Sequence, residues 1–185
     1  MIRDWRQAWS EGDFPFLFVP IANWNTAAED LWPDVRDAQR QALVLKNTGM
    51  AVTIDIGDPV DIHPKNKQDV GLRLALAARS ITYGEKVEWS GPLYRQVTQE
   101  EHALRVWFDH ANGLTAKGTE LTGFEVAGED GKYSAAEARI DGASVVVSSS
   151  AAPKPVSVRC GWAANPTCNL ANREGLPASP FKAPE

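Results

Sequence analysis

The sequence predicts a mixed fold in which a partial α/β layer of parallel strands and helices precedes an antiparallel β-sandwich-like region. Residues 2 to about 85 alternate apolar runs of strand length with stretches of helical periodicity, a pattern typical of a parallel α/β layer. After Gly84 the pattern changes to short alternating strands separated by turn residues, which is typical of antiparallel sheets. We therefore divide the chain into an α/β part, residues 1–85, and an antiparallel β domain with a C-terminal tail, residues 86–185.

The α/β part begins with a predicted helix and a predicted strand. Ile2, Trp5 and Trp9 recur at helical spacing, so we expect a short first helix. Residues 14–22 (FPFLFVPIA) form a continuous apolar run. A run of this length predicts a strand that is buried on both faces.

Two further helices are predicted to flank a second strand. A helix is expected over residues 33–45 with Pro33 as its first residue, a buried strand over residues 50–56 (MAVTIDI), and a helix over residues 64–82. The apolar stripes that we expect to be buried are Val35, Ala38, Ala42 and Leu45 on the earlier helix and Val70, Leu74, Ala77 and Ile81 on the later one. Alternation of strands and helices predicts parallel strands.

The β domain is predicted from alternating strands and tight turns. Strands are expected over residues 103–108, 144–149 and 156–162, and Asp130-Gly131 and Asp141-Gly142 are typical of hairpin turns. Residues 165–185 are rich in Asn, Pro and Gly, so we expect a tail that runs along the surface.

The composition excludes several classes of protein. Hydrophobic residues make up 43% and charged residues 23% of the 185 positions, and the formal net charge is −5. This balance argues against nucleic acid or an anionic membrane as the main partner. No apolar run reaches membrane-spanning length, and Met1 to Arg6 do not form a signal peptide. The two cysteines exclude a disulfide framework and a four-thiolate zinc site.

The loop after the second strand holds the strongest candidate site. Asp55, Asp58, Asp61 and His63 lie within nine positions of one another and precede Pro64. In open α/β sheets, functional groups gather at the carboxyl ends of strands. With Pro64 as first helical residue, His63 would lie near the helix N-cap, where the helix end disfavours an imidazolium and a nearby carboxylate favours it. Such a histidine suits general base catalysis, although an aspartate at a strand end is also an ordinary turn former.

Residues 55–79, DIGDPVDIHPKNKQDVGLRLALAAR, resemble the histidine-bearing block of the sialate O-acetylesterase family, which are serine esterases of the SGNH (GDSL-like) superfamily. Residues 2–24, 83–94 and 160–181 resemble other segments of that family in the same order. The resemblance implies a carbohydrate O-acetylesterase: a serine attacks an acetyl ester and a histidine transfers the proton. It implies a substrate of acetylated sugar or glycan, and neither a metal nor an organic cofactor.

The resemblance assigns roles to individual residues. His63 corresponds to the general base, and Asp61, within the Asp-Ile-His-Pro block, to the acid that orients it. The wider superfamily places this acid three residues before the histidine, where this chain has Val60. The orienting acid therefore stays open between Asp61 and Asp58, with Asp55 less favoured because it lies within the strand pattern.

The family's nucleophile block, of the type Gly-Gln-Ser-Asn-Met, has no counterpart in this sequence. Ser10, Ser90 and Ser144 lie in helix, turn and strand patterns and do not replace it. The chain thus resembles the C-terminal half of an esterase, and we expect no esterase activity from it alone. The expected partner is the missing N-terminal half or a second copy of the chain, since a bare sheet edge favours association. Members of the family are typically secreted, periplasmic or lysosomal, which leaves the localisation of this chain unknown.

Weaker candidates complete the set. Asn23 and Trp24 follow the first strand at the sheet edge that holds His63, so they are predicted to line the substrate pocket. His102 and His110 fit a metal pair less well than ordinary surface positions. The tryptophans are expected mainly in cores, but Trp24, Trp89, Trp107 and Trp162 could instead form sugar-stacking surfaces. The alternative function is a non-catalytic carbohydrate-binding β module with a relic α/β segment. Cys160 and Cys168 fit either a disulfide in an oxidising compartment or unpaired burial.

Overall fold

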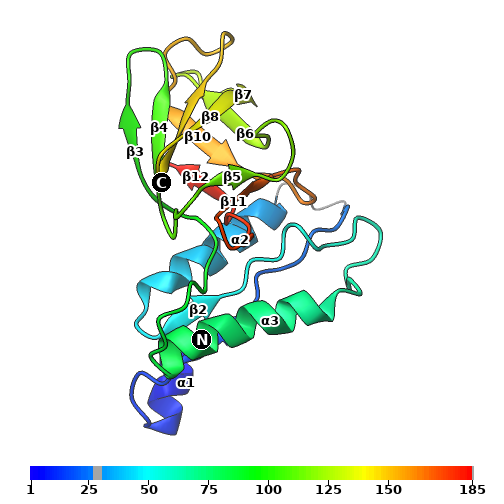
Figure 1. The fold of residues 1–185 in the computed structure, drawn as a ribbon, viewed down its shortest axis with the longest axis vertical. Coiled ribbons are helices and arrows are strands. Elements are labelled where there is room, and N and C mark those ends of the chain that lie inside the picture. Colours follow the sequence, from blue (N-terminus) through cyan, green and yellow to red (C-terminus); the bar gives the residue numbers. More distant parts are fainter. Residues whose placement is uncertain (27–30, 185) are drawn as a thin grey trace.

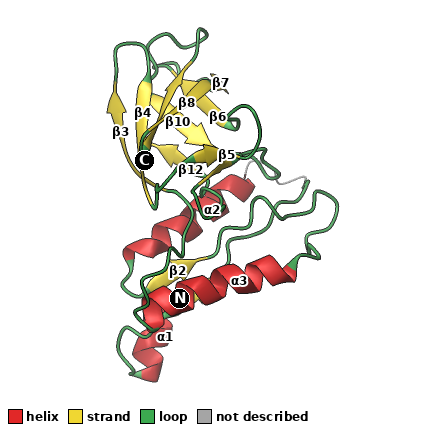
Figure 2. Ribbon diagram, viewed as in Figure 1, coloured by secondary structure: helices red, strands yellow, loops and turns green. Residues whose placement is uncertain are grey.

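The computed structural model describes residues 1–26 and 31–184. Helices occur only in the first part of these residues, and short strands fill the rest (Figures 1 and 2). The elements of the first part are α1 (Ile2–Trp9), β1 (Phe16–Phe18), α2 (Leu31–Gln41) with the 3-10 turn Ala42–Val44, β2 (Thr48–Met50), and α3 (Lys67–Ala77) with the π-helical turn Ala78–Thr82. None of the described helices has both the length and the apolar character that crossing a membrane requires.

The two strands of the first part form a parallel sheet with helices on both faces. Leu17 pairs with Gly49, and a Cβ at Gly49 would lie 2.6 Å from Ile81 Cδ1, so glycine allows the turn after α3 to pack directly on this face. Phe16 and Phe18 point to the opposite face because side chains alternate along a strand. That face is covered in part by α1 and α2 (Figure 1).

The remaining strands form antiparallel sheets, as predicted. One sheet has the order β3-β4-β9-β8, a second has the order β12-β10-β6-β7, and β11 pairs with β5. Their bounds are β3 (Leu93–Gln99), β4 (Leu104–Asp109), β5 (Thr115–Ala116), β6 (Phe124–Ala127), β7 (Ser134–Ala135), β8 (Glu137–Asp141), β9 (Ser144–Ser148), β10 (Ser157–Cys160), β11 (Leu170–Ala171) and β12 (Phe181–Ala183). The predicted hairpin turns are present, with Gly131 and Gly142 at φ 69° and 60°.

The main core lies within these β sheets. The inward residues of β4 alternate with outward ones, which gives a half-buried strand its period of two. Its contributors from the β sheets include Leu104, Val106, Phe108, Phe124, Val126, Val145, Val147, Val158, Leu170 and Phe181. Met50, Val52 and Ile54 of the α/β part belong to the same cluster.

Two predictions for the β domain are wrong. Within the predicted tail, residues 165–184 do not run along the surface: β12 pairs with β10, and the fully buried ring of Phe181 stacks on Tyr94 at a centroid distance of 4.9 Å. Residue 185 lies outside the described residues. The Pro and Gly residues of this segment lie between short strands, and they do not prevent the segment from packing into the core. None of the tryptophans is among the buried residues. Trp107, for example, alternates with the buried Val106 and Phe108 and faces outward.

β1 is shorter than the strand predicted over residues 14–22, and β2 overlaps the strand predicted over residues 50–56 only at Met50. β1 ends at Phe18 and β2 at Met50, and the last hydrogen bond between the segments runs from the Ala51 amide to the Phe18 carbonyl at 2.9 Å. Residues 51–54 are nevertheless buried. The apolar run therefore predicted correctly that these residues are buried. It did not predict that they lie outside the β-ladder, because no further strand pairs with them among the described residues. β1 is also half-buried, not buried on both faces.

The helices differ from the predicted ranges for local reasons. α3 begins at Lys67 because the Asn66 side chain caps it, accepting from the Asp69 amide at 3.2 Å, as asparagine commonly does at an N-cap. His63 therefore lies three residues before the cap and not beside it. The predicted stripes are buried only in part: Ala77 is 0% exposed, whereas Val35 is 44% exposed. The side chains buried on α2 and α3 also include Arg36 and Arg73.

Candidate functional site

The loop between β2 and α3 leaves the sheet at the carboxyl end of β2, and two aspartates shape it. Asp58 Oδ1 accepts hydrogen bonds from the Val60 and Asp61 amides at 2.9 and 3.3 Å. Asp61 Oδ1 accepts one from the His63 amide at 2.8 Å. These are turn-forming contacts between an aspartate and the backbone two or three residues on. They fix the backbone path that presents His63.

His63 itself is exposed to solvent. Among the described residues, no hydrogen bond or ion pair joins its imidazole ring to Asp61 or Asp58, so the structure brings all three into one loop without pairing the ring with a carboxylate. Asp61 holds the histidine through its main chain. His63 is therefore an exposed side chain whose ring has no carboxylate partner within this loop.

Asp55 has a structural role in this geometry. Its carboxylate is bound by Arg73 through two hydrogen bonds of 2.6 and 2.8 Å and by Lys117 Nζ at 2.9 Å. Burial raises the pKa of Asp55, but hydrogen bonds and charge from Arg73 and Lys117 outweigh it, so the pKa lies below its usual value. Since Arg73 also donates to the Val52 carbonyl at 2.6 Å, Asp55 ties α3 and the β domain to the start of the loop. Its oxygens are occupied and do not face His63.

Asn23 lies where predicted, at the sheet edge beside this loop, but its side chain is buried. Its Nδ2 donates to the Ile54 carbonyl at 2.5 Å, and its backbone packs so closely on Gly57 that a Cβ there would lie 2.5 Å from Asn23 Cβ. The amide is therefore used to join the two strand ends. Trp24 is half-buried, with its ring against Trp32 at a centroid distance of 5.7 Å.

Arg36 is a central residue of this edge that the sequence analysis missed. It is 2% exposed, and its guanidinium donates to the carbonyls of residues 21, 22, 163 and 164 and to Asn23 Oδ1, at 2.7 to 3.0 Å. Burial lowers its pKa to about 10. Arg36 stands beside Val35 in a helix with ordinary periodicity, and an arginine there carries no sequence signal that separates it from a surface residue.

The two other histidines do not form a pair. His102 precedes β4 and His110 follows it, so the length of the strand separates them. His102 contacts the Pro153 carbonyl at 3.2 Å, whereas His110 Nδ1 lies 2.6 Å from Glu88 Oε1. Across residues 1–26 and 31–184, no three His, Cys, Asp or Glu side chains come together as metal ligands would.

Comparison with known proteins gives matches in both sequence and structure. A sialate O-acetylesterase of Mus musculus is 34% identical over 117 residues, covering 52% of this chain and 22% of that protein. One of Homo sapiens is 32% identical over 122 residues, covering 55% and 23%. The crystal structure of a carbohydrate acetylesterase from Xanthomonas citri superimposes with a TM-score of 0.96 and 42% identity, covering 100% of this chain and 44% of that one. No protein-family model matches.

These proteins are carbohydrate esterases. The whole fold of this chain is similar to the solved one, and about half of its sequence is similar to the curated ones. Within that class, the resemblance to the sialate O-acetylesterase family that residues 55–79 and their flanking segments predict is confirmed. The chain spans less than half of the length of the solved relative and under a quarter of the curated ones.

Proposed function

We propose that this chain is the histidine-bearing part of a carbohydrate O-acetylesterase, of sialate type, whose nucleophilic serine lies in a part of the α/β layer outside the chain. The observation that carries the proposal is the exposed imidazole of His63 on a loop at the carboxyl end of a parallel strand. Similarity to a carbohydrate acetylesterase of more than twice the length supports it.

In this proposal His63 is the general base. It accepts the proton of the serine hydroxyl as that oxygen attacks the acetyl carbonyl, and it then protonates the sugar oxygen that leaves. Water repeats the sequence and releases acetate. Asp61 is the first candidate for the orienting acid and Asp58 the alternative, since either carboxylate lies within the same short loop.

The three serines considered above as substitutes for the nucleophile each donate to a nearby backbone carbonyl. Ser90 Oγ is buried and donates to the Gly91 carbonyl at 2.9 Å, and Ser144 Oγ donates to the Asp141 carbonyl at 2.7 Å. Ser10 Oγ donates to the Gln7 carbonyl of its own helix at 3.2 Å. The isolated chain is therefore proposed to be inactive, because a triad without its nucleophile loses most of its rate enhancement.

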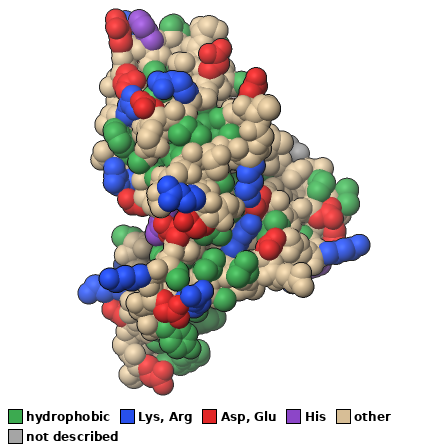
Figure 3. Space-filling view, in the orientation of Figure 1, with side chains coloured by type: hydrophobic (Ala, Val, Ile, Leu, Met, Phe, Trp, Pro, Cys, Tyr) green, Lys and Arg blue, Asp and Glu red, His purple; other side chains and the backbone are tan. Residues whose placement is uncertain are grey.

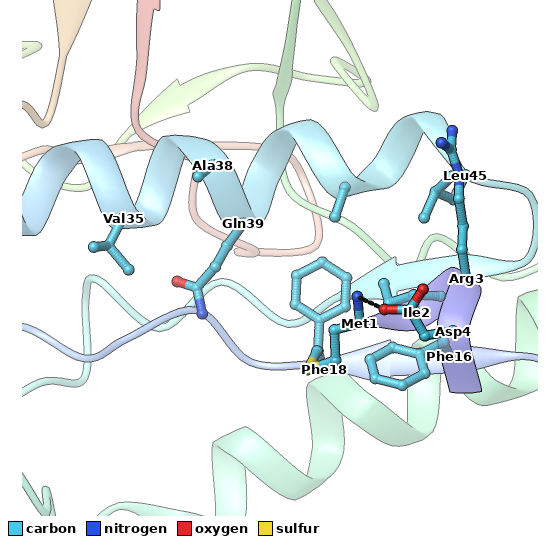
Figure 4. Close-up of a pocket in the computed structure, with 11 residues that line it drawn as sticks. Met1, Ile2, Arg3, Asp4, Phe16, Phe18, Val35, Ala38, Gln39 and Leu45 are labelled. Carbon is cyan, nitrogen blue, oxygen red and sulfur yellow. Dashed lines mark ion pairs between the residues drawn. The ribbon is translucent and has the colours of Figure 1, made fainter. Parts of the chain in front are cut away.

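The surface that would receive the remaining part is an apolar groove between α1, β1 and α2, which we call the α1–α2 groove. It encloses about 570 Å³ and is lined by Ile2, Phe16, Phe18, Val35, Ala38, Ala42 and Leu45, among others. Figure 4 shows Val35 and Gln39 projecting from α2 toward the side of β1, and the Phe18 ring projecting from β1 toward α2. The space-filling view shows hydrophobic side chains gathered at the end of the molecule that α1 occupies (Figure 3). A further strand and helix of the α/β layer would cover this surface.

The alternative, a non-catalytic carbohydrate-binding β module, has less support. A cleft of about 740 Å³ lies beside β7 and β8, but its only aromatic lining residue is Phe124, which is 3% exposed. Sugar binding usually uses exposed aromatic faces, and this cleft does not offer one.

Hydrolysis of an acetylated sugar, assayed with and without the complementing part, tests the proposal. The chain alone should release no acetate. Mixed with a polypeptide that spans the rest of the Xanthomonas citri esterase, it should release acetate, and His63→Ala should abolish this. His102→Ala, at another exposed histidine, is the matched control and should leave the rate unchanged. Turnover by the chain alone, or complemented turnover that survives His63→Ala, would overturn the proposal.

A further inference from the structure

The two cysteines lie next to each other inside the β domain. Cys160 is the last residue of β10 and Cys168 comes two residues before β11. The side chains are 0% and 9% exposed, and the two Sγ atoms are 2.9 Å apart without being bonded. Nonbonded carbon atoms pack at about 3.5–4.0 Å, and a disulfide needs about 2.05 Å. The fold therefore holds the sulfurs closer than ordinary packing does.

Glycines on both sides of the pair permit this approach. A Cβ at Gly123 would lie 2.8 Å from Cys168 Cα, and one at Gly161 would lie 3.4 Å from Cys168 Cβ. The Gly161 amide also donates to the Gly123 carbonyl at 2.9 Å. The backbone at Gly123 thus passes close to Cys168, and its hydrogen bond with Gly161 joins it to the residue that follows Cys160.

The loop between the cysteines contacts the candidate site. The carbonyls of Ala163 and Ala164 accept hydrogen bonds of 2.7 Å each from the buried guanidinium of Arg36. The same guanidinium holds Asn23 Oδ1 at 3.0 Å, and the Trp24 amide donates to the Ala164 carbonyl at 3.4 Å. The geometry of this loop therefore sets the position of the segment that lies against the His63 loop.

We propose that Cys160 and Cys168 form a disulfide that fixes this loop and, through Arg36, orders the carboxyl end of β1 beside the His63 loop. The functional consequence for that site rests on the proposed function, whereas the bond itself does not. It would be a modification that constrains the edge of the active site from outside the catalytic residues.

The oxidant is a low-molecular-weight disulfide such as oxidised glutathione. One protein thiolate attacks it, displaces one glutathione thiolate and forms a mixed disulfide. The second protein thiolate then attacks the protein sulfur of that intermediate and displaces the other glutathione. Two thiols of the protein lose two electrons and two protons, and two molecules of reduced glutathione are produced. Burial raises the pKa of the Cys160 thiol, and neither sulfur is accessible once folded, so the exchange takes place before the core closes.

Counting thiols tests the bond. The full chain is refolded with a mixture of oxidised and reduced glutathione, denatured, and alkylated with iodoacetamide with or without prior reduction, and its intact mass is measured. We expect no adduct before reduction and two after it. Two adducts before reduction would overturn the proposal.

Thermal unfolding gives a second test. Dithiothreitol should lower the midpoint of the oxidised protein by roughly 5–10 °C, the shift expected for opening a short covalent loop in a domain of this size. The double variant Cys160→Ala, Cys168→Ala should show no response to dithiothreitol. If that variant does not fold, the thiol count still decides the matter. An equal response of the two proteins would contradict the proposed bond.

Amide hydrogen exchange tests the link to the site separately. The amides of Trp24 and of the loop between the cysteines should exchange more slowly in the oxidised protein than in the reduced one, while the β8–β9 hairpin serves as an internal control and stays unchanged. Equal exchange at Trp24 in both forms would overturn the link. Because this readout requires no activity, its failure is distinct from a failure of the acetylesterase proposal.

Discussion

The β domain and the α/β part differ in how fully they bury their apolar side chains. In the β domain, Val106, Val126, Val145, Val147 and Val158 are each 0% exposed. In the α/β part, the sheet has two short strands, Trp9 is 61% exposed, and the α1–α2 groove is open. One region closes its own core, whereas the other exposes a surface of the kind that packs against further protein. The change in unfolding free energy caused by mutations in each region therefore measures which of the two regions has a closed hydrophobic core.

The largest expected effect is in the β domain. Phe181→Ala should lower the free energy of unfolding by about 3–5 kcal/mol, because a fully buried ring packed on Tyr94 and Phe108 leaves a cavity. Trp9→Ala, which removes a larger but exposed side chain, should cost less than about 1 kcal/mol. Urea unfolding of both variants measures this difference. Equal losses would mean that α1 belongs to a closed core.

An intermediate effect on the unfolding free energy is expected at Asp55, which links the α/β part to Lys117 of the β domain, when the pH is lowered. The pKa of Asp55 lies below its value of about 3.9 in an unfolded chain. Ionised Asp55 thus contributes stability that is fully present above that unfolded value and is lost as the pH falls through the lower folded pKa. Unfolding free energies measured between pH 6 and about pH 2 should decline less steeply in Asp55→Asn than in the parent protein. Asp58→Asn, in the exposed turn, is the control and should follow the parent curve.

The smallest effect on stability, but a clear one on association, is expected in the α1–α2 groove. The isolated chain should self-associate, and Val35→Ser should reduce the apparent mass in light scattering while changing the unfolding free energy by less than about 0.5 kcal/mol. Val156→Ser is the matched control, since Val156 has a similar exposure, 42% against 44%, but lies in the β domain. A parent protein that is monomeric at every concentration would show that the groove needs no cover.

The sequence predicted element types better than it predicted what each element packs against. Alternation along residues 103–108 identified a strand with one buried face, because the partner sheets that bury it lie in the same chain. The apolar stripe that includes Val35 and Ala38 was equally regular, yet it lines an open groove. Periodicity reports that a face is apolar and does not report whether its cover is present.

For the candidate site, the sequence predicted where the residues lie in the fold but not which groups their side chains contact. The residues around His63 and Asn23 do come together at one sheet edge, as expected from adjacent parallel strands. The role of Arg36 was not predicted, because its partners include backbone carbonyls far away in the sequence. Every residue has a backbone carbonyl, so such partners cannot be recognised from the sequence. The assignment of the orienting acid to Asp61 or Asp58 stays a prediction.

Two of the contacts between the α/β part and the β domain should respond differently to dissolved salt. Lys117, whose side chain is 44% exposed, reaches Asp55 as a cation to an anion, so mobile ions weaken that attraction. The oxygens that Arg36 contacts among the described residues are uncharged, and its contacts with Asn23 and Ala164 are buried. Concentrated sodium chloride should therefore weaken the contact between Lys117 and Asp55 and leave the hydrogen bonds of Arg36 intact.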